Sequence, residues 1–315
     1  MGRYLANRFI LAIPTLIVVS ILIFGGVRVI PGDVCFLVLQ TPEVTDEQCD
    51  RVYQRLGLDK PAVQQYFSWM GNAVQGDLGR SMISERPVLE EIRARMNLTL
   101  QLTFLASLFA VALAIPIGVY SALRQDTLPD YALRIMTIGW LSMPAFWVAT
   151  MLVTFPAKWW GYATPVGYAD LWEDPLQNLE QLYMPAIALG LALSASLARL
   201  TRSSMLEVLR QDYVRTARAK GLSERVVLSR HALKNAMLPV MTLFGLQLAF
   251  LMGGTVVLES IFALPGLGTL LLTSVTFKDY TTIQGIVLFF AVLILIINIL
   301  VDLSYAWFDP RIRYS

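Results

Sequence analysis

The chain has 315 residues, of which 56% are hydrophobic and 15% are charged, and its mean hydropathy is +0.58. Soluble domains carry about 25% charged residues, so this composition excludes an ordinary soluble protein and indicates an integral membrane protein. A net charge of +2 without a long basic run excludes nucleic acid as a partner. Membrane lipid is therefore the expected environment of most of the surface.

Six apolar segments are long enough, or nearly so, to cross a bilayer as helices, which takes about 20 residues. They are Phe9–Ile30, Leu98–Leu123, Leu133–Phe155, Leu182–Leu200, Val240–Leu258 and Ile283–Phe308. The first follows two arginines, as in a signal peptide, but no small-residue cleavage site comes after it, so we expect it to be retained. The predicted fold class is an all-α integral membrane protein with six transmembrane helices, the last five forming a core over residues 98–308.

Lys and Arg are distributed unequally between the two sets of loops that six spans separate. The N-terminus, residues 124–132, residues 201–239 and the tail 309–315 lie on one side and carry many of these charges. The short loops on the other side carry only Lys158 and Lys278. The positive-inside rule therefore places both termini in the cytoplasm, together with the long basic loop 201–239.

Residues 31–97 then follow the N-terminus and first span (1–30) as an extracytoplasmic insertion, which we expect to be a small helical platform. This stretch holds more acidic than basic residues, and long loops are largely exempt from the charge rule. It also contains both cysteines, Cys35 and Cys49. An oxidising exterior and their modest spacing predict a disulfide, and two free thiols that never meet are the alternative.

Small residues recur every four positions in three of the spans, a pattern that favours close packing between helices in lipid. The ladders are Ala106, Ala110, Ala114, Gly118 and Ala122 in the second span, Ala186, Gly190, Ser194 and Ala198 in the fourth, and Gly245, Ala249 and Gly253 in the fifth. The first and sixth spans consist mainly of Ile, Leu, Val and Phe. We therefore expect spans two to five inside the protein and spans one and six nearer the lipid.

Met143, Phe146 and Trp147 lie midway along the third span, where Pro144 allows a kink. They could line or plug a pathway, and packing in the core is an equally good alternative. No phosphate-binding loop, zinc-protease or serine-hydrolase motif occurs in the sequence, and no chain of carboxylates or histidines crosses the membrane. The chain is therefore expected to be neither an enzyme nor an ion-coupled carrier, and to bind no metal or cofactor itself.

The loop 201–239 contains a basic, helical segment that is too polar to enter a bilayer. Apolar residues recur at helical spacing from Met205 to Ala217, which predicts one helix over Arg202–Lys220. Gly221 then suits the left-handed position after a helix, and Ser223 can cap a second helix. This helix–Gly–helix elbow could project below the membrane, and a pair of amphipathic helices lying on the bilayer is the alternative.

The segment Arg215–Gly221, with the sequence RTARAKG, resembles the Glu-Ala-Ala…Gly motif of ABC importer permeases in the form typical of dipeptide and oligopeptide permeases. Further stretches resemble that family, in the expected order along the whole chain: Pro31–Asp33, Leu56–Pro61, Gly76–Gly79 with Ser81, Arg202–Val208, Asn235–Pro239, Leu264–Gly268 and Asp309–Arg313. Arg215 stands where the general motif has Glu, which is usual in the peptide branch. The chain is thus identified as a member of the peptide/nickel/glutathione permease family and resembles its first, B-type subunit.

The resemblance implies partners and a mechanism. A second, homologous permease would complete the pathway, two ABC ATPase subunits would bind ATP and Mg²⁺ below it, and an extracytoplasmic solute-binding protein would deliver the solute, in the inner membrane of a prokaryote. The residues implied to contact an ATPase subunit, as a coupling helix, are Arg215, Thr216, Ala217, Arg218, Ala219, Gly221 and Leu222.

Di- or oligopeptides are the solutes that the resemblance implies. The segment Ala157–Gln181 between the third and fourth spans is short for a dipeptide permease. Glutathione and nickel permeases have a short loop there, so glutathione, nickel or another small solute is the alternative. An ion-coupled secondary carrier is a remote one, because the sequence lacks the buried titratable groups that it would need.

Overall fold

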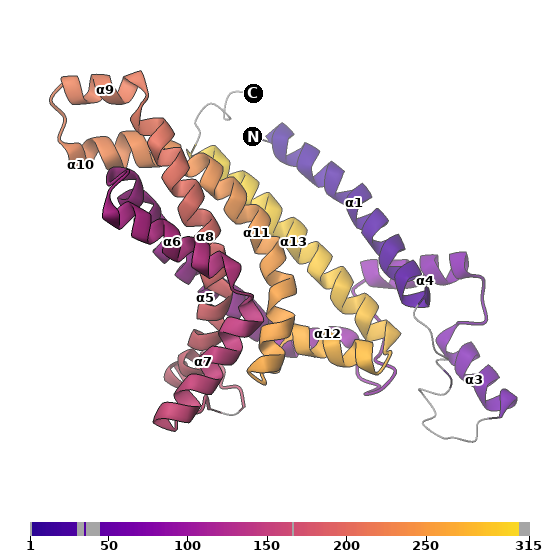
Figure 1. Cartoon of the computed structure of the whole chain (residues 1–315). Helices are drawn as coiled ribbons and strands as arrows, with labels where there is room; N and C mark the ends of the chain where they lie inside the picture. Colours follow the sequence, from indigo (N-terminus) through magenta and orange to yellow (C-terminus); the bar gives the residue numbers. More distant parts are fainter. Residues whose placement is uncertain (1, 30–34, 36–44, 166, 309–315) are drawn as a thin grey trace. The chain divides into compact units, whose positions relative to one another are not determined.

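The computed structural model describes residues 2–29, 35, 45–165 and 167–308. Helices dominate this part of the chain, which also contains an isolated β-bridge between Arg80 and Pro87 (Figure 1). Five helices are long and apolar enough to cross a membrane, and a sixth span results if one sharply bent helix pair counts as a single span. The all-α membrane class predicted from the sequence is confirmed.

The described helices carry the labels of Figure 1. They are α1 (Gly2–Val29), α3 (Asp46–Leu56), α4 (Ala62–Val74), α5 (Val88–Leu123), α6 (Leu128–Ser142), α7 (Ala145–Trp160), α8 (Pro175–Leu209), α9 (Asp212–Ala219), α10 (Glu224–Val226), the π-helix η1 (Val227–Leu233), α11 (Lys234–Ile261), α12 (Leu267–Thr276) and α13 (Tyr280–Phe308). The chain forms two compact units, which we describe separately. Unit 1 contains Leu98–Leu264 and the end of α13 from Ile296, and unit 2 contains Gly2–Asn97 and Pro265–Leu295.

The third predicted span is not one continuous helix. The structure divides it into α6 and α7, whose axes are bent by 96°. Met143 adopts an extended conformation (φ −91°, ψ 121°) because the ring of the following proline disfavours a helical residue before it, and Pro144 is the N-cap of α7. The sequence predicted a possible kink at Pro144, but Leu133–Phe155 is not one continuous helix; in a six-span arrangement, α6 and α7 together form a single broken span.

α8 lies at the centre of unit 1. Of its most apolar stretch, 72% of the residues are buried, against 39% for α5 and 28% for α11. A Cβ atom added at Gly190 would lie 2.8 Å from the carbonyl oxygen of Ala106, and one added at Gly118 would lie 2.7 Å from that of Ala198. The backbones of α5 and α8 therefore approach as closely as the small-residue ladders of the second and fourth spans predicted.

The ladder of the fifth span behaves differently. A Cβ atom at Gly245 would meet Val301 of α13 at 2.5 Å, whereas nothing lies within 4 Å of one at Gly253. The most apolar stretches of α11 and α13 are buried to the same extent, 28%. Burial within this chain therefore does not separate the fifth span from the sixth, and their expected order stays a prediction.

Unit 2 contains the region predicted to be an extracytoplasmic helical insertion. A disulfide joins Cys35 to Cys49, the latter on α3. The rings of Tyr66 and Trp69 on α4 pack against Phe24 of α1, and the Tyr66 hydroxyl is 2.8 Å from that of Ser20. These two aromatic residues thus serve mainly to attach α4 to α1.

A second contact in unit 2 holds the loop before α5. The buried carboxylate of Asp279 accepts hydrogen bonds from the Ser81 hydroxyl (2.5 Å), the Met82 N–H (3.1 Å) and the Thr282 hydroxyl (2.7 Å). Asp279 directly precedes α13, so this loop is fixed to the start of that helix. The same loop lines a cavity of about 620 Å³ together with residues of α1 and α4.

Candidate coupling site

The segment predicted to be a single helix over Arg202–Lys220 is instead two helices, α8 and α9. α8 begins at Pro175, after the N-cap Asp174, whose carboxylate accepts a hydrogen bond from the Gln177 N–H at 3.0 Å, and it ends at Leu209. Gln211 then adopts an extended conformation (φ −71°, ψ 146°), and the chain turns into the short α9. Helical periodicity continues across this break, which is why the apolar pattern alone did not locate it.

α9 ends at a Schellman motif, in which Gly221 takes the left-handed position that the sequence predicted for it. Gly221 has φ +77°, its N–H donates to the Arg218 carbonyl at 2.9 Å, and the Leu222 N–H donates to the Ala217 carbonyl at 3.4 Å. The chain then reverses into α10 and η1, which lead into α11. We call the segment from α9 to the end of η1, residues 212–233, the elbow. In Figure 1 it lies beyond the adjoining ends of α8 and α11.

The elbow has a small hydrophobic core of its own. Val214, Ala217 and Val227 are buried there, with Val208 and Leu209 of α8 packed against them. This arrangement corrects one predicted site residue, because Ala217 is only 6% exposed and its side chain faces the elbow's interior. Its small size is needed for packing within the chain, and it offers little surface to a partner.

The other predicted contact residues lie on the outside of the elbow. Arg215, Thr216, Arg218, Ala219, Gly221 and Leu222 are all exposed. Leu222 is 41% exposed, as an apolar side chain at the tip. These six exposed positions lie on α9 and the turn that follows it.

Arg218 also fastens the two arms of the elbow together. Its Nη2 atom donates to Glu224 Oε1 at 2.7 Å and its Nε atom to Glu224 Oε2 at 3.2 Å, and this hydrogen bonding raises the pKa of the Arg218 guanidinium. Both side chains are well exposed, so the pair contributes little to the free energy of unfolding. Ser223 occupies the predicted N-cap position of α10, but its side chain makes no capping hydrogen bond.

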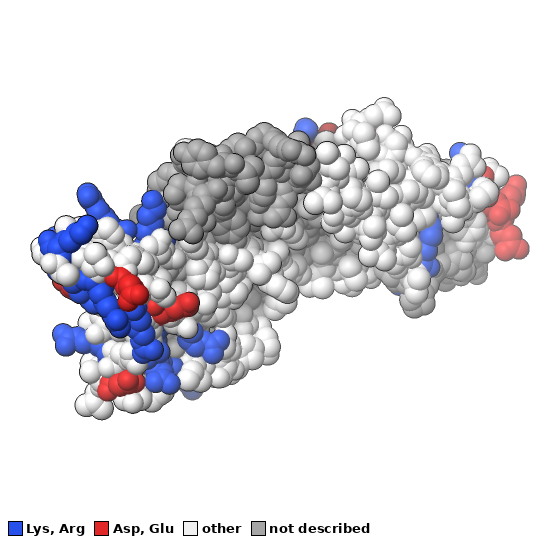
Figure 2. Space-filling view, turned by 90° about the horizontal axis from the view of Figure 1, so that it is seen from above, with Lys and Arg blue, Asp and Glu red and all other residues white. Residues whose placement is uncertain are grey.

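The elbow is strongly basic. Figure 2 shows Lys and Arg gathered at one end of the view, at the left, where α9 and α10 lie. Exposed cations on and directly after the elbow are Arg215, Arg218, Lys220, Arg225, Arg230 and Lys234, against the exposed carboxylates of Asp212 and Glu224. Such a surface favours a partner with acidic groups or a polar groove.

η1 is a feature that sequence reasoning missed. Residues Val227–Leu233 form a π-helix that continues directly into α11. Asn235 stabilises this junction, because its side-chain amide donates to the His231 carbonyl and to the Tyr213 hydroxyl, both at 2.9 Å. His231 is half-buried at the base of the elbow. No local pattern in the sequence distinguishes a π-helix from an α-helix here.

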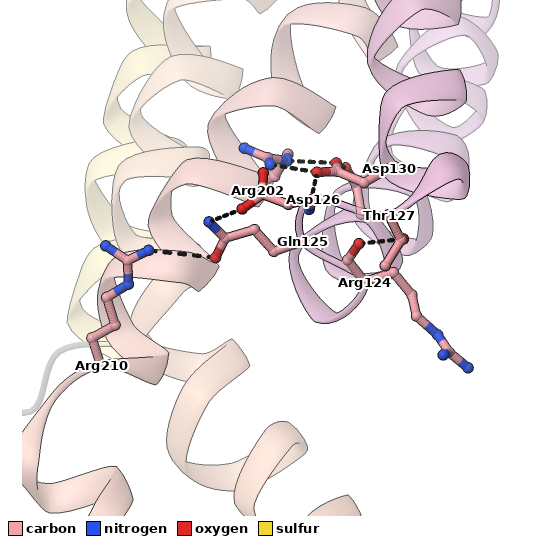
Figure 3. Close-up of polar contacts among 8 residues, drawn as sticks. Arg124, Gln125, Asp126, Thr127, Asp130, Arg202 and Arg210 are labelled. Atoms are coloured by element: carbon pink, nitrogen blue, oxygen red, sulfur yellow. Dashed lines mark hydrogen bonds and ion pairs between the residues drawn. The ribbon is translucent and has the colours of Figure 1, made fainter.

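A buried ion pair beside the elbow was also missed. Asp130, at the start of α6, is fully buried, and its carboxylate receives two hydrogen bonds from the guanidinium of Arg202 on α8 (Figure 3). The two residues are 72 positions apart, so only the tertiary structure could reveal the pair. The sequence marks Arg202 only as part of a family motif and as one of the basic residues of the loop 201–239.

The structure exposes the predicted pathway residues. Met143, Phe146 and Trp147 are 41%, 54% and 44% exposed at the break between α6 and α7, so they are not part of this chain's core. The alternative of core packing within the chain is therefore wrong for these side chains. An exposed apolar surface on the spans of a membrane protein faces lipid, a partner helix or a pathway.

Two family models match the sequence. The family model described as "Binding-protein-dependent transport system inner membrane component" matches residues 114–314. The model for the N-terminal part of the same membrane components matches residues 1–103. The chain belongs to this family. It is accordingly an inner-membrane permease subunit of an ABC importer, not an enzyme, and separate ATPase subunits hydrolyse the ATP.

Relatives in the family match from end to end. The chain is 41% identical over 315 residues to the glutathione transport system permease protein GsiC of Escherichia coli (strain K12), covering 100% of both chains. The GsiC protein of Shigella dysenteriae serotype 1 (strain Sd197) matches to the same extent. Among solved structures, an amino acid ABC transporter with histidines is 17% identical, with 65% of this chain and 88% of that chain covered and a TM-score of 0.48.

Proposed function

We propose that this permease imports a short peptide-like solute, with glutathione as the first candidate. The observation that carries this proposal is the 41% identity to the glutathione permease over the whole of both chains. The short segment between α7 and α8, Gly161–Asp174, agrees with it, because the resemblance associates a short loop here with glutathione and nickel permeases. Di- and oligopeptides and nickel remain the other candidate solutes.

The proposed complex contains four kinds of subunit. A second, homologous permease pairs with this chain and completes the pathway, and a solute-binding protein docks on the extracytoplasmic side, where unit 2 presents the insertion 31–97. Two ATPase subunits bind ATP and Mg²⁺ on the cytoplasmic side. Both termini of this chain face the cytoplasm, a placement supported by the uneven distribution of Lys and Arg.

In this proposal, the elbow is the coupling element and its exposed face inserts into a groove on one ATPase subunit. The contact residues are Arg215, Thr216, Arg218, Ala219, Gly221 and Leu222, and Ala217 supports them from inside. A lever must resist bending, and the elbow's own core and its Schellman motif stiffen it. Closure of the ATPase pair would then displace α8 and α11, to which the elbow is attached.

Reconstitution tests the proposed function. The complex of both permeases and both ATPases is placed in proteoliposomes with the binding protein, and uptake of radiolabelled glutathione is measured with and without ATP. We expect uptake that requires both ATP and the binding protein. Radiolabelled dipeptide and radioactive Ni²⁺ are measured in parallel, and uptake of either of these in place of glutathione would reassign the solute.

The same system separates the importer from an ion-coupled carrier. A secondary carrier would work as a single subunit, so the purified chain alone would support uptake driven by an ion gradient. We expect no uptake above that of empty liposomes from the chain alone. Uptake by the isolated chain would overturn the proposed function.

A further inference from the structure

The carboxylate of Asp130 is a meeting point of three elements. It accepts hydrogen bonds from the Ser121 hydroxyl near the end of α5, from the Asp126 N–H in the turn before α6 (3.1 Å) and from Arg202 on α8. Arg202 donates through Nε to Oδ1 at 2.8 Å and through Nη2 to Oδ2 at 2.6 Å. Asp130 is 0% exposed and Arg202 20% exposed, so the pair is largely shielded from water and from screening by salt.

A second contact lies further along α8. Arg210, at the end of this helix, donates to the side-chain oxygen of Gln125 at 3.4 Å, and Gln125 belongs to the same turn between α5 and α6 (Figure 3). Arg202 and Arg210 are separated by about 12 Å along a helix that rises about 1.5 Å per residue. The turn therefore has a second, weaker contact with α8 in addition to the Asp130–Arg202 pair.

Close packing joins the same region of α8 to the elbow. Met205 is fully buried between Ala122 of α5 and Ala232 and Ala236, which lie in η1 and α11. Next to it, the elbow's core packs on Val208 and Leu209. The end of α8, the elbow and the α5–α6 turn are therefore joined without an intervening flexible segment.

The other end of α6 is the break before α7. α6 begins at the ion pair and ends at Ser142, after which the chain bends by 96° and exposes Met143, Phe146 and Trp147. α6 thus connects the α8 attachment point to the exposed apolar residues at the bend. A displacement applied at the elbow reaches this bend if the Asp130–Arg202 contact holds.

We propose that Asp130 and Arg202 are positioning residues that transmit movement of the elbow to α6 and to the bend before α7. The inference rests on the proposed function, because it assumes that an ATPase subunit moves the elbow. A bidentate guanidinium–carboxylate pair suits this role, since its two parallel hydrogen bonds fix orientation as well as distance. Lys cannot reproduce this geometry, although it keeps the charge.

The test places a reporter thiol at the bend. Ser142→Cys lies at the end of α6, is exposed and is a small change, and both native cysteines are held in the disulfide. The rate of labelling by a fluorescent maleimide is measured in the complete complex, with and without ATP, Mg²⁺ and vanadate. We expect nucleotide to change this rate when the Asp130–Arg202 pair is intact.

The variants are Arg202→Lys and Asp130→Asn, and the matched control is Arg199→Lys, an exposed arginine one turn earlier on α8. In Arg202→Lys, we expect the ATPase subunits to co-purify in parental amounts while the nucleotide-dependent change in labelling falls about tenfold, within the usual range of coupling energies. The control should retain the full change. A purely structural role would lower the amount of assembled complex without lowering the change in labelling of the complex that remains.

The outcomes separate the two proposals. The transmission role would be overturned if nucleotide changed the labelling rate in both variants as much as in the parent complex. It would also be overturned if nucleotide did not change the labelling rate in the parent complex. If Asp130→Asn fails to assemble, Arg202→Lys still decides, because it preserves the charge of the pair. Absence of ATP-dependent uptake of glutathione, of the dipeptide and of Ni²⁺ would instead overturn the proposed function, whatever the labelling shows.

Discussion

Arg202 on α8 holds both carboxylate oxygens of Asp130 on α6, at 2.8 Å and 2.6 Å. This contact lies about seven residues before the end of α8, where the chain turns into the elbow. A charged pair shielded from water is costly to break from one side, because the remaining charge has lost its partner. Its position near the end of α8 underlies the transmission role that we propose for it.

Removing one member of this pair should destabilise the isolated permease strongly. We expect Asp130→Ala to lower the free energy of unfolding by about 3–5 kcal/mol, since it leaves the Arg202 guanidinium without its carboxylate. The double variant Asp130→Ala/Arg202→Met should be less destabilised than the single one. Unfolding in detergent, followed by tryptophan fluorescence, measures both, and additive losses in the double variant would contradict the pairing.

The close approach of α5 and α8 predicts the effect of adding single methyl groups. Gly118→Ala would place a Cβ atom 2.5 Å from the Thr201 Cβ, and Gly190→Ala would place one 2.8 Å from the Ala106 carbonyl oxygen. Each should cost about 1–3 kcal/mol of unfolding free energy, because the helices must separate. Gly253→Ala is the control: nothing lies within 4 Å of the added atom, so it should be neutral or slightly stabilising in the same measurement.

Two alanines in α9 should respond differently to the same enlargement. Ala217→Trp overfills the elbow's buried core and should unfold the elbow, which limited proteolysis would detect as new cleavage between α8 and α11. Ala219→Trp lies on the exposed face and should leave the elbow resistant to protease while preventing co-purification of the ATPase subunits. Normal ATPase binding by Ala219→Trp would remove this face from the proposed contact.

Two substitutions of Gly221 should differ in severity, with a small effect for alanine and a large one for proline. Its φ of +77° is unfavourable for other residues, yet open space surrounds the position, so Gly221→Ala should cost only about 1 kcal/mol. Gly221→Pro excludes positive φ and removes the N–H that donates to Arg218, so it should abolish ATPase activity stimulated by solute-loaded binding protein. Stimulation that survives Gly221→Pro would contradict the role of a fixed elbow.

The disulfide makes a prediction for unit 2. Cys35 and Cys49 are 14 positions apart, and closing a loop of about 15 residues stabilises a fold by about 3 kcal/mol. Reduction, or the pair Cys35→Ser/Cys49→Ser, should increase amide hydrogen exchange in α3. Exchange in α8 and α9, which belong to unit 1, should not change, and an equal increase there would contradict a local effect.

Much of the architecture could be predicted from local sequence properties. Apolar length located the membrane helices, four-residue repeats of small residues marked the second and fourth spans as closely packed, and Gly221 marked the end of α9, because each signal depends on neighbours within a few turns of one helix. The family motif in Arg215–Gly221 located the elbow, because its residues also lie close together in the sequence. Six of the seven residues predicted to contact an ATPase lie on the elbow's exposed face.

Long-range contacts and precise breaks were decided by the tertiary structure alone. Helical periodicity runs through Arg210 and Gln211, so it could not show that α8 stops there, and a proline at position 144 permits any bend from a slight kink to the observed 96°. Ala217 lies within the family motif that marks contact residues, yet it is buried like a core residue. Its burial depends on Val214 and Val227, which pack around it only in the folded elbow. The partner of Asp130 lies 72 positions away in the sequence. The sequence could not reveal this pair, because pairing between charges on different helices depends on where the helices meet in space and not on the spacing of residues along one helix.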